Sequence, residues 1–219
     1  MLRPLRGTLS PLGRATAVAS SWWLSGGISA ANCVGAYQAK GAASYAASKV
    51  NLANPGAYTL ADPAPPSWDA ASGWTSTGSA RLRTGIVPAS GYSIIVRFSG
   101  AVAGALVSAA SFAPLYFECY LSSSARSYAA GAATRTAVAG GITAGVMAVA
   151  GPKGYLDGVE EVALPYTGAP STDFGIFFEH FGGGGGYDPF AGNIQAVAIY
   201  NATLTAGQVA AVTTAMNAL

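Results

Sequence analysis

Residues 190–219 read FAGNIQAVAIYNATLTAGQVAAVTTAMNAL and contain the clearest signals for the fold. Residues 194–200 form a short apolar run that is typical of a buried β-strand. Thr205 and Gln208 have the spacing of a capping box, in which the two residues satisfy each other's backbone N–H groups at the start of a helix. The spacing predicts a helix over 205–217. Its apolar stripe, which should pack on a β-sheet, consists of Val209, Val212, Met216 and Leu219.

Upstream of this stretch, short apolar runs alternate with Gly, Pro, Ser and Asn from about residue 33 onward, which is typical of a β-sandwich or barrel. Further strands are expected at 92–98, 115–121, 146–150 and 174–181. Asp157-Gly158 lies between two short apolar segments and tolerates the positive φ of a two-residue hairpin turn. These patterns predict an all-β fold with antiparallel strands.

The first 30 residues differ in composition from the rest of the chain. They begin with Arg, Pro and Gly, continue with Ala and Ser, and include a short helix that we expect over 15–24. The sequence shows no internal repeat and no second core. We therefore expect an N-terminal arm, residues 1–30, and one domain, residues 31–219.

Two motifs resemble the end of laminin-G-like, concanavalin-A-like jelly-roll domains. The hairpin AVAGPKGYLDGVEE at 148–161 precedes a strand and helix whose pattern is G-x-I-x-x-V-x-I-Y-N followed by L-T-x-x-Q-V. The matching residues are Gly192, Ile194, Val197, Ile199, Tyr200, Asn201, Leu204, Thr205, Gln208 and Val209. The resemblance covers residues 33–219 and implies an antiparallel two-sheet jelly-roll sandwich with a C-terminal α-helix. This fold supports lectins, adhesins, glycosidases and structural domains alike.

Composition narrows the functional classes. Hydrophobic residues make up 51% of the 219 residues and charged residues only 9%, so the chain can bury a core and is not disordered. A net charge of +2 cannot neutralise many phosphates, which argues against nucleic-acid binding. The uncharged runs are broken by Ser, Gly, Asn or Pro, so no membrane partner and no cleaved signal peptide are predicted. Sparse charge instead suggests a surface covered by neighbours, as in a homo-oligomer.

Catalytic signatures are absent from the sequence. Glu160 and Glu161 are adjacent and would point to opposite faces of a strand, while Glu118 stands alone, so no glycosidase pair is recognised. His180 is the only histidine, and a surface or edge position is the simpler interpretation. We therefore predict no enzymatic activity, no cofactor and no metal site.

Two smaller questions stay open at this stage. Asp173 and Asp188 are candidate calcium ligands, but no spaced acidic cluster supports them. Cys33 and Cys119 could form one disulfide, although Cys119 shares an alternating face with Phe117 and Leu121, which favours a buried free thiol.

The segments at 36–56 and 66–86 resemble domains found in bacteriophage virion proteins. This resemblance favours a structural protein on the surface of a virus particle, a capsid decoration or tail-associated subunit that contacts shell or tail proteins. The arm would attach it. Its candidate contacts are Arg3, Arg6 and Arg14 for an acidic surface and Trp22, Trp23 and Leu24 as apolar anchors. An arm that folds back on its own sandwich is the alternative.

The second functional hypothesis is a carbohydrate-binding adhesin module on a virion fibre or cell surface. Aromatic faces stack on sugar rings, and four aromatic residues lie near predicted loops: Trp68, Trp74, Tyr155 and Tyr187. Tryptophans in a sandwich are more often part of the core. The deciding observation is whether these residues line one exposed groove or lie buried.

Overall fold

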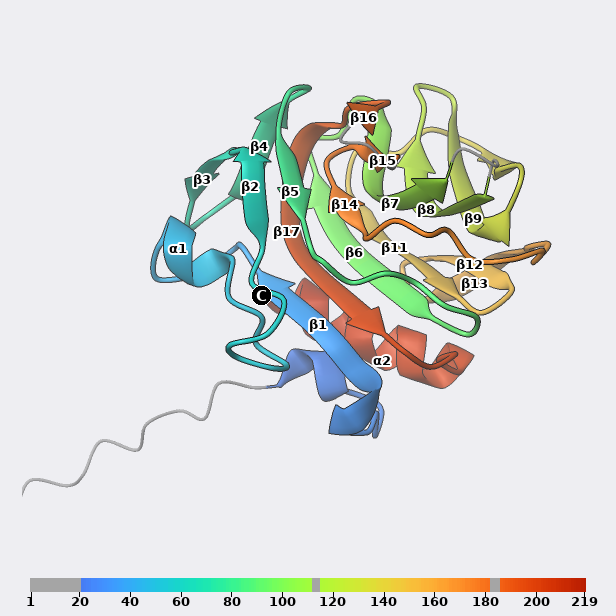
Figure 1. Cartoon of the computed structure of the whole chain (residues 1–219), viewed down its shortest axis with the longest axis horizontal. Helices are drawn as coiled ribbons and strands as arrows, with labels where there is room; N and C mark the ends of the chain where they lie inside the picture. The colour runs from blue at the N-terminus through green and yellow to red at the C-terminus, as the bar shows by residue number, and fades with distance from the viewer. Residues whose placement is uncertain (1–20, 112–114, 182–185) are drawn as a thin grey trace, which may run out of the picture.

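The computed structural model describes residues 21–111, 115–181 and 186–219, and these form two antiparallel sheets stacked face to face (Figure 1). Sheet A contains β1 (Cys33–Gln38), β3 (Ser67–Asp69), β4 (Gly73–Thr77), β6 (Ser93–Ser99), β11 (Gly145–Ala150), β12 (Lys153–Leu156), β13 (Val159–Ala163) and β17 (Ala191–Tyr200). Its order is β13-β12-β11-β6-β17-β4-β3, and β1 pairs with the half of β17 that β4 leaves free. The prediction of an all-β sandwich is confirmed.

Sheet B contains β2 (Ala61–Ala64), β5 (Arg81–Arg83), β7 (Gly104–Ser111), β8 (Leu115–Leu121), β9 (Ala125–Ala132), β10 (Thr136–Ala139) and β14 (Gly175–Ile176). Its order is β10-β9-β8-β7-β14-β5-β2. A small hairpin, β15 (Glu179–His180) and β16 (Gly186–Tyr187), lies against β7. The helical segments are the 3-10 turns η1 (Trp22–Leu24) and η2 (Ala30–Asn32) and the α-helices α1 (Tyr45–Ser48) and α2 (Ala206–Asn217).

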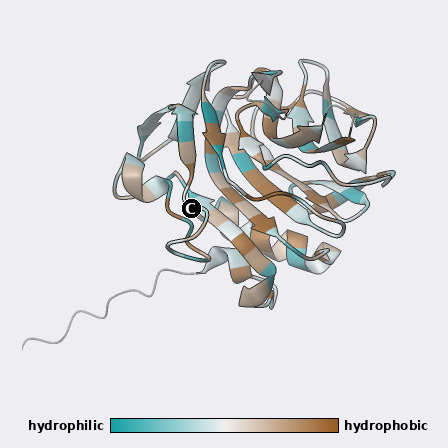
Figure 2. Ribbon diagram, in the orientation of Figure 1, coloured by the Kyte–Doolittle hydropathy of each residue, from teal (hydrophilic) through white to brown (hydrophobic). Residues whose placement is uncertain are grey.

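The core between the sheets is formed by the inward residues of the alternating strands. Apolar colour follows the long central strands of sheet A in Figure 2. On β8, Phe117, Cys119 and Leu121 point into this core, while Glu118 points out of it. Its largest fully buried members include Tyr37, Trp74, Phe98, Phe117, Tyr128, Phe174, Phe177 and Phe190.

Helix α2 covers the outer face of sheet A, as its apolar stripe predicts. The capping box is present: the backbone N–H of Gln208 donates to Thr205 Oγ1 at 3.3 Å, and the N–H of Thr205 donates to Gln208 Oε1 at 3.0 Å. The stripe is buried in a second apolar cluster whose members include Val209, Val212, Met216, Trp22, Ile95, Val146, Ala148, Tyr155, Ala198 and Tyr200, with Leu219 partly buried beside them. Sheet A is thus apolar on both faces.

The predicted hairpin turn is confirmed. Asp157 and Gly158 join β12 to β13 with φ values of 48° and 82°, the positive values that the sequence pair was expected to tolerate. The prediction of one strand over 174–181 is wrong. Phe177 has a φ of 75°, which breaks the extended backbone, so β14 stays in sheet B and β15 leaves it to pair with β16.

The start of the described chain packs on its own domain. Trp22 is 3% exposed, and its Nε1 donates to Gln38 Oε1 at 3.0 Å. The Tyr200 hydroxyl donates to the carbonyl oxygen of Trp23 at 2.9 Å. Of the helix expected over 15–24, positions 15–20 lie outside the described residues, and Trp22–Leu24 forms the turn η1.

Two further observations concern the cysteines and the length of the helices. Cys33 and Cys119 are both free and buried, Cys119 in the core between the sheets and Cys33 in the cluster under α2. In the part of the chain that the structure describes, none of the helices has the length and apolar character needed to cross a membrane.

Candidate functional site

Strand β5 places two arginines on the outer face of sheet B. Because side chains alternate along a strand and Leu82 is fully buried in the core, Arg81 and Arg83 both extend from the opposite face. Arg83 lies opposite Ala61 on β2 and Gly175 on β14, so its backbone is paired on both sides. The local sequence therefore fixes two neighbouring cations on one rigid strand.

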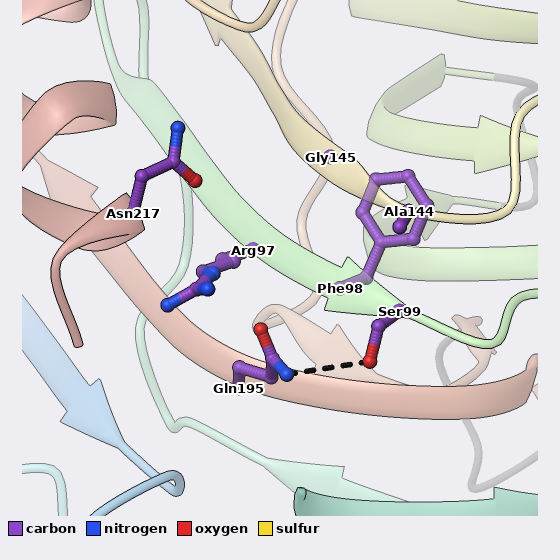
Figure 3. Close-up of a pocket in the computed structure, with 7 residues that line it drawn as sticks. All are labelled: Arg97, Phe98, Ser99, Ala144, Gly145, Gln195 and Asn217. Carbon is purple, nitrogen blue, oxygen red and sulfur yellow. Dashed lines mark hydrogen bonds between the residues drawn. The ribbon is translucent and has the colours of Figure 1, made fainter.

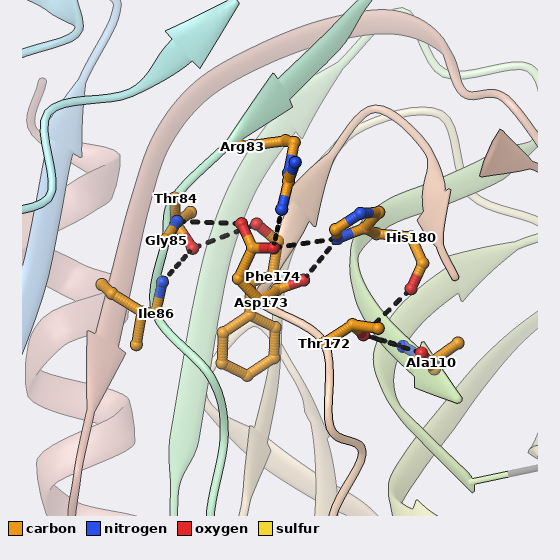
Figure 4. Close-up of polar contacts among 9 residues, drawn as sticks. All are labelled: Arg83, Thr84, Gly85, Ile86, Ala110, Thr172, Asp173, Phe174 and His180. Atoms are coloured by element: carbon orange, nitrogen blue, oxygen red, sulfur yellow. Dashed lines mark hydrogen bonds and ion pairs between the residues drawn. The ribbon is translucent and has the colours of Figure 1, made fainter. Parts of the chain in front are cut away.

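Asp173 organises the groups around Arg83 (Figure 4). Its Oδ1 accepts from Arg83 Nη2 at 2.5 Å, and its Oδ2 accepts from the Gly85 N–H at 2.9 Å. The Nδ1 atom of His180 lies 3.2 Å from Asp173 Oδ1 and 2.8 Å from the Asp173 carbonyl oxygen. His180 is itself held by its backbone, since its carbonyl accepts from Thr172 Oγ1 at 3.1 Å. The carboxylate is therefore fixed by three donors.

This environment determines the charge of Asp173. Burial alone would raise the pKa of its carboxyl group, but the hydrogen bonds from the imidazole, the guanidinium and the backbone N–H outweigh burial and hold the pKa well below its ordinary value. Asp173 is therefore ionised at neutral pH.

The prediction that His180 lies at the surface or at an edge is corrected. Its side chain is only 5% exposed and faces the Asp173 carboxylate.

A hollow of about 250 Å³ opens on one side of Arg83. We call it the Tyr58 hollow, and its lining residues are Tyr58, Thr59, Ala61, Arg83, Thr84, Gly85 and Asp173. The Tyr58 residue is 48% exposed, so its ring is available to a ligand. Its backbone has a φ of 56°, a left-handed conformation that is costly for an aromatic residue, and its carbonyl is held by the Tyr37 hydroxyl at 2.7 Å.

A second hollow, of about 90 Å³, lies on the other side of Arg83. We call it the Arg81 hollow, and its lining residues are Pro63, Arg81, Arg83, Phe178 and His180. The Arg81 guanidinium lies over the Phe178 ring, 5.7 Å from its centroid. Together the two hollows present an exposed aromatic ring, one carboxylate, two guanidinium groups and an imidazole within a single stretch of surface.

A second charged group on the same face, which we call the Arg135 cluster, joins Arg135 to Glu118, Glu179 and Asp188. The guanidinium also lies 5.1 Å from the Tyr116 ring centroid and 4.2 Å from that of Tyr120. Burial raises the pKa of Glu118, and burial followed by the nearby charge of Glu118 raises the pKa of Glu179 to about 7. These groups satisfy one another and hold the β15–β16 hairpin on sheet B.

A third hollow, of about 320 Å³, is on sheet A beside the end of α2 (Figure 3). Its lining residues are Arg97, Phe98, Ser99, Ala144, Gly145, Gln195 and Asn217. The Arg97 guanidinium already binds α2, because its Nη1 donates to the Met216 carbonyl oxygen at 2.6 Å. Phe98 is 1% exposed and offers no ring face. This hollow therefore lacks the groups that make the Arg83 region distinctive.

The four aromatic residues predicted to contact glycan do not line one groove. Trp74 is fully buried with its Nε1 bound to Ser48 Oγ at 2.8 Å, and Tyr155 is 1% exposed under α2. Trp68 lies opposite Trp74 and is half-buried against the core, with its Nε1 donating to the Ala39 carbonyl at 2.8 Å. Tyr187 alone is well exposed, at 61%, and belongs to the β15–β16 hairpin.

The candidate attachment residues are divided by the structure. Arg3, Arg6 and Arg14 lie outside the described residues. Trp22 is buried in its own domain, and Trp23 and Leu24 are half-buried against the same cluster. The indole of Trp22 thus packs on sheet A of its own domain. This is what the alternative expects, in which the arm folds back on its own sandwich.

The acidic candidates are paired with cations. Glu160 binds Lys153 and Glu161 binds Arg126, on opposite sides of β13. Asp173 and Asp188, the calcium candidates, contact Arg83 and Arg135. Across residues 21–111, 115–181 and 186–219, no three His, Cys, Asp or Glu side chains are grouped so that they could hold a metal ion.

The fold defines the chain as an antiparallel β-sandwich of the jelly-roll type, and solved structures of this type resemble it. A mutant of Trypanosoma rangeli sialidase that displays trans-sialidase activity matches with a TM-score of 0.61 and 12% identity, over 86% of this chain and 34% of that one. Domain 4 of AbnA, a GH43 extracellular arabinanase from Geobacillus stearothermophilus, in complex with arabinotriose, matches with a TM-score of 0.53 and 16% identity, over 83% of this chain and 98% of that one. No family model and no curated protein sequence matches the chain.

Trypanosoma rangeli sialidase in complex with sialic acid also matches, with a TM-score of 0.58 and 12% identity, over 85% of this chain and 33% of that one. The chain thus spans about a third of the length of the sialidases it resembles. These matches contradict the prediction that the chain is not an enzyme, because the same sandwich is part of chains that are sialidases. The prediction rested on the missing carboxylate pair and on the single histidine of this chain. The comparisons give no link to virus particles.

Sequence reasoning missed Tyr58, Arg81 and Arg83. The alternation Arg81-Leu82-Arg83 was the available signal, since it places two cations on one face of a strand. Tyr58 carried no comparable signal, because its position beside Arg83 depends on the loop that precedes β2.

Proposed function

We propose that this chain is a carbohydrate-binding β-sandwich module whose binding site is the Tyr58 hollow. The observation that carries the proposal is the exposed Tyr58 ring beside the fixed ion pair of Asp173 and Arg83, all lining one hollow of about 250 Å³. Ligand sites combine an apolar or aromatic wall with a few convergent polar groups, and this hollow has both.

Each part of the hollow has a distinct role toward a sugar. The Tyr58 ring offers an apolar face for the C–H side of a pyranose or furanose ring. The ionised Asp173 carboxylate accepts from hydroxyl groups, and the Arg83 guanidinium donates to them, both as charge-assisted hydrogen bonds. Because both charges are fixed by neighbours before a ligand arrives, little ordering is needed on binding.

The match to domain 4 of the arabinanase supports this proposal, because that domain is described in complex with arabinotriose and is matched over 98% of its length. The finer setting, a homo-oligomeric subunit or adhesin on the surface of a virus particle or cell, stays a prediction. Its basis is the resemblance of residues 36–56 and 66–86 to domains of virion proteins, together with the sparse charge and the three arginines in residues 1–14.

A glycan array that includes arabinotriose, followed by calorimetry on the tightest oligosaccharide, tests the proposal. Tyr58→Ala should weaken binding by about tenfold, or ~1.4 kcal/mol, because it removes the aromatic face. Tyr58→Gly should weaken it equally while tolerating the left-handed backbone better. Tyr166→Ala is the matched control, because Tyr166 is 44% exposed and lines a separate hollow of about 240 Å³.

Binding that survives both Tyr58 substitutions, or that Tyr166→Ala reduces instead, would place the site elsewhere. An array on which the wild-type chain binds no oligosaccharide would overturn the proposed function.

A further inference from the structure

The Arg81 hollow and the Tyr58 hollow are adjacent and share one wall. Arg83 lines both of them, with its side chain 45% exposed between them. A ligand whose ring rests on Tyr58 therefore reaches the second hollow with a group that projects past Arg83.

The Arg81 hollow carries positive charge that the protein does not neutralise. Arg83 is paired with Asp173, whereas Arg81 makes no ion pair with any of the residues described by the structure. His180 uses its Nδ1 toward Asp173, which leaves its Nε2 as the ring nitrogen available to a ligand. A cationic wall of this kind favours a negatively charged occupant.

The guanidinium of Arg81 is held in place before any ligand binds. It lies over the ring of Phe178, which is 3% exposed and therefore fixed in the fold. Pro63, whose ring restricts its backbone, lines the same hollow from β2. An arginine fixed in this way offers a planar pair of donors, the geometry that matches a carboxylate or sulfate oxygen pair.

The volume of the Arg81 hollow limits the size of the occupant. At about 90 Å³ it is much smaller than the Tyr58 hollow, which has about 250 Å³. The smaller hollow therefore suits a small anionic group, and the larger one suits the sugar ring.

We propose that the Arg81 hollow binds an anionic substituent, a carboxylate or a sulfate ester, of the sugar whose ring lies in the Tyr58 hollow. This inference rests on the proposed function and narrows it to acidic glycans. Arg81 and Arg83 supply the donors, and His180 completes the wall of the hollow.

The test compares matched glycans on an array that pairs neutral oligosaccharides with their uronic-acid and sulfated counterparts. We expect the acidic member of a pair to bind about tenfold more tightly. Arg81→Gln should abolish that preference and leave neutral binding unchanged. Lys153→Gln is the control for loss of one positive charge, because Lys153 is an exposed residue on sheet A.

A second readout uses the fact that the chain has one histidine. In a titration with glucuronate followed by NMR, the imidazole signals of His180 should shift saturably in the wild-type chain and in Lys153→Gln, but far less in Arg81→Gln. Preference for uronic acids assigns the carboxylate, and preference for sulfated sugars assigns the sulfate ester.

Equal binding of neutral and acidic glycans, with Tyr58→Ala still reducing both, would overturn this inference and leave the proposed function intact. Absence of binding to every glycan on the array would overturn both.

Discussion

The outer face of sheet A and the outer face of sheet B have the same strand geometry and opposite chemistry. On sheet A the outward residues Ile95, Val146 and Ala198 are apolar and are buried beneath α2 and Trp22. On sheet B the outward residues include Arg81 and Glu118, and the cover over them is the short β15–β16 hairpin. The outer face of sheet A is buried by internal packing. The outer face of sheet B has charged groups and hollows that are open to a ligand.

The contrast shows where many of the apolar residues of the chain lie. Hydrophobic residues make up 51% of the sequence, and many of them form a second internal layer between sheet A and α2. The homo-oligomer suggested by the sparse charge stays a prediction. The site that remains is built from the scarce charged residues, concentrated on the other sheet.

The largest expected effect comes from placing one charge under the helix. Val212→Asp puts a carboxylate at a position that is 0% exposed and surrounded by apolar side chains, and should lower the free energy of unfolding by about 4 kcal/mol. Arg81→Asp on the open face should lower it by less than about 1 kcal/mol. Urea denaturation of both variants measures the difference, and equal losses would contradict the contrast between the faces.

A smaller loss is expected on sheet B itself, where Arg135 pairs with the buried carboxylates of Glu118 and Glu179. Arg135→Gln leaves the fully buried Glu118 with Ser108 as its remaining hydrogen-bond donor, and should cost about 3 kcal/mol. Lys153→Gln, which breaks the exposed pair with Glu160, should leave the urea midpoint unchanged. Similar midpoints for the two variants would show that the Arg135 cluster does not hold the hairpin.

A third effect is a pH dependence of stability. Because the pKa of Glu179 is raised to about 7 in the folded chain, the folded state holds a proton that the unfolded state releases at lower pH. This contribution to stability is fully present below about pH 4.5 and is lost as the pH rises through 7. Glu179→Gln should remove that decline, so that the difference in stability between the variant and the wild type changes by about 3 kcal/mol across the interval.

Asp173, on the same face of sheet B, changes stability with pH in the opposite direction to Glu179. Its pKa is lowered in the fold, so its contribution is present above the pKa of the unfolded chain and is lost in acid. Asp173→Asn should therefore flatten the stability curve below about pH 4, where Glu179→Gln leaves it unchanged. Curves that flatten in the same interval for both variants would contradict the assignment.

Much of the fold could be predicted because its signals are local. The capping box at Thr205, the alternation on β8 and the turn at Asp157 each depend on residues within a few positions of one another. The division of 174–181 into two strands could not be predicted, because the positive φ of Phe177 follows from the packing of its ring in the core.

The site was less predictable for the same reason. Tyr58, Arg83 and Asp173 come from three distant parts of the chain and meet only through sheet pairing and a loop. Trp74 and Tyr155, two of the candidate sugar contacts near predicted loops, have their rings buried on the two faces of sheet A. The alternation of residues along a strand shows that the sheet has two different faces. Only the tertiary structure shows which face is covered by the rest of the chain.

The position of β17 has a consequence for biosynthesis. This strand lies between β6 and both β1 and β4, yet it is the last strand of sheet A to leave the ribosome. Until it emerges, three strands wait with unpaired backbone edges, and the sheet cannot close. Folding of sheet A should therefore be slow, because it waits for β17 to emerge, and until then the exposed strand edges can pair with another chain and aggregate.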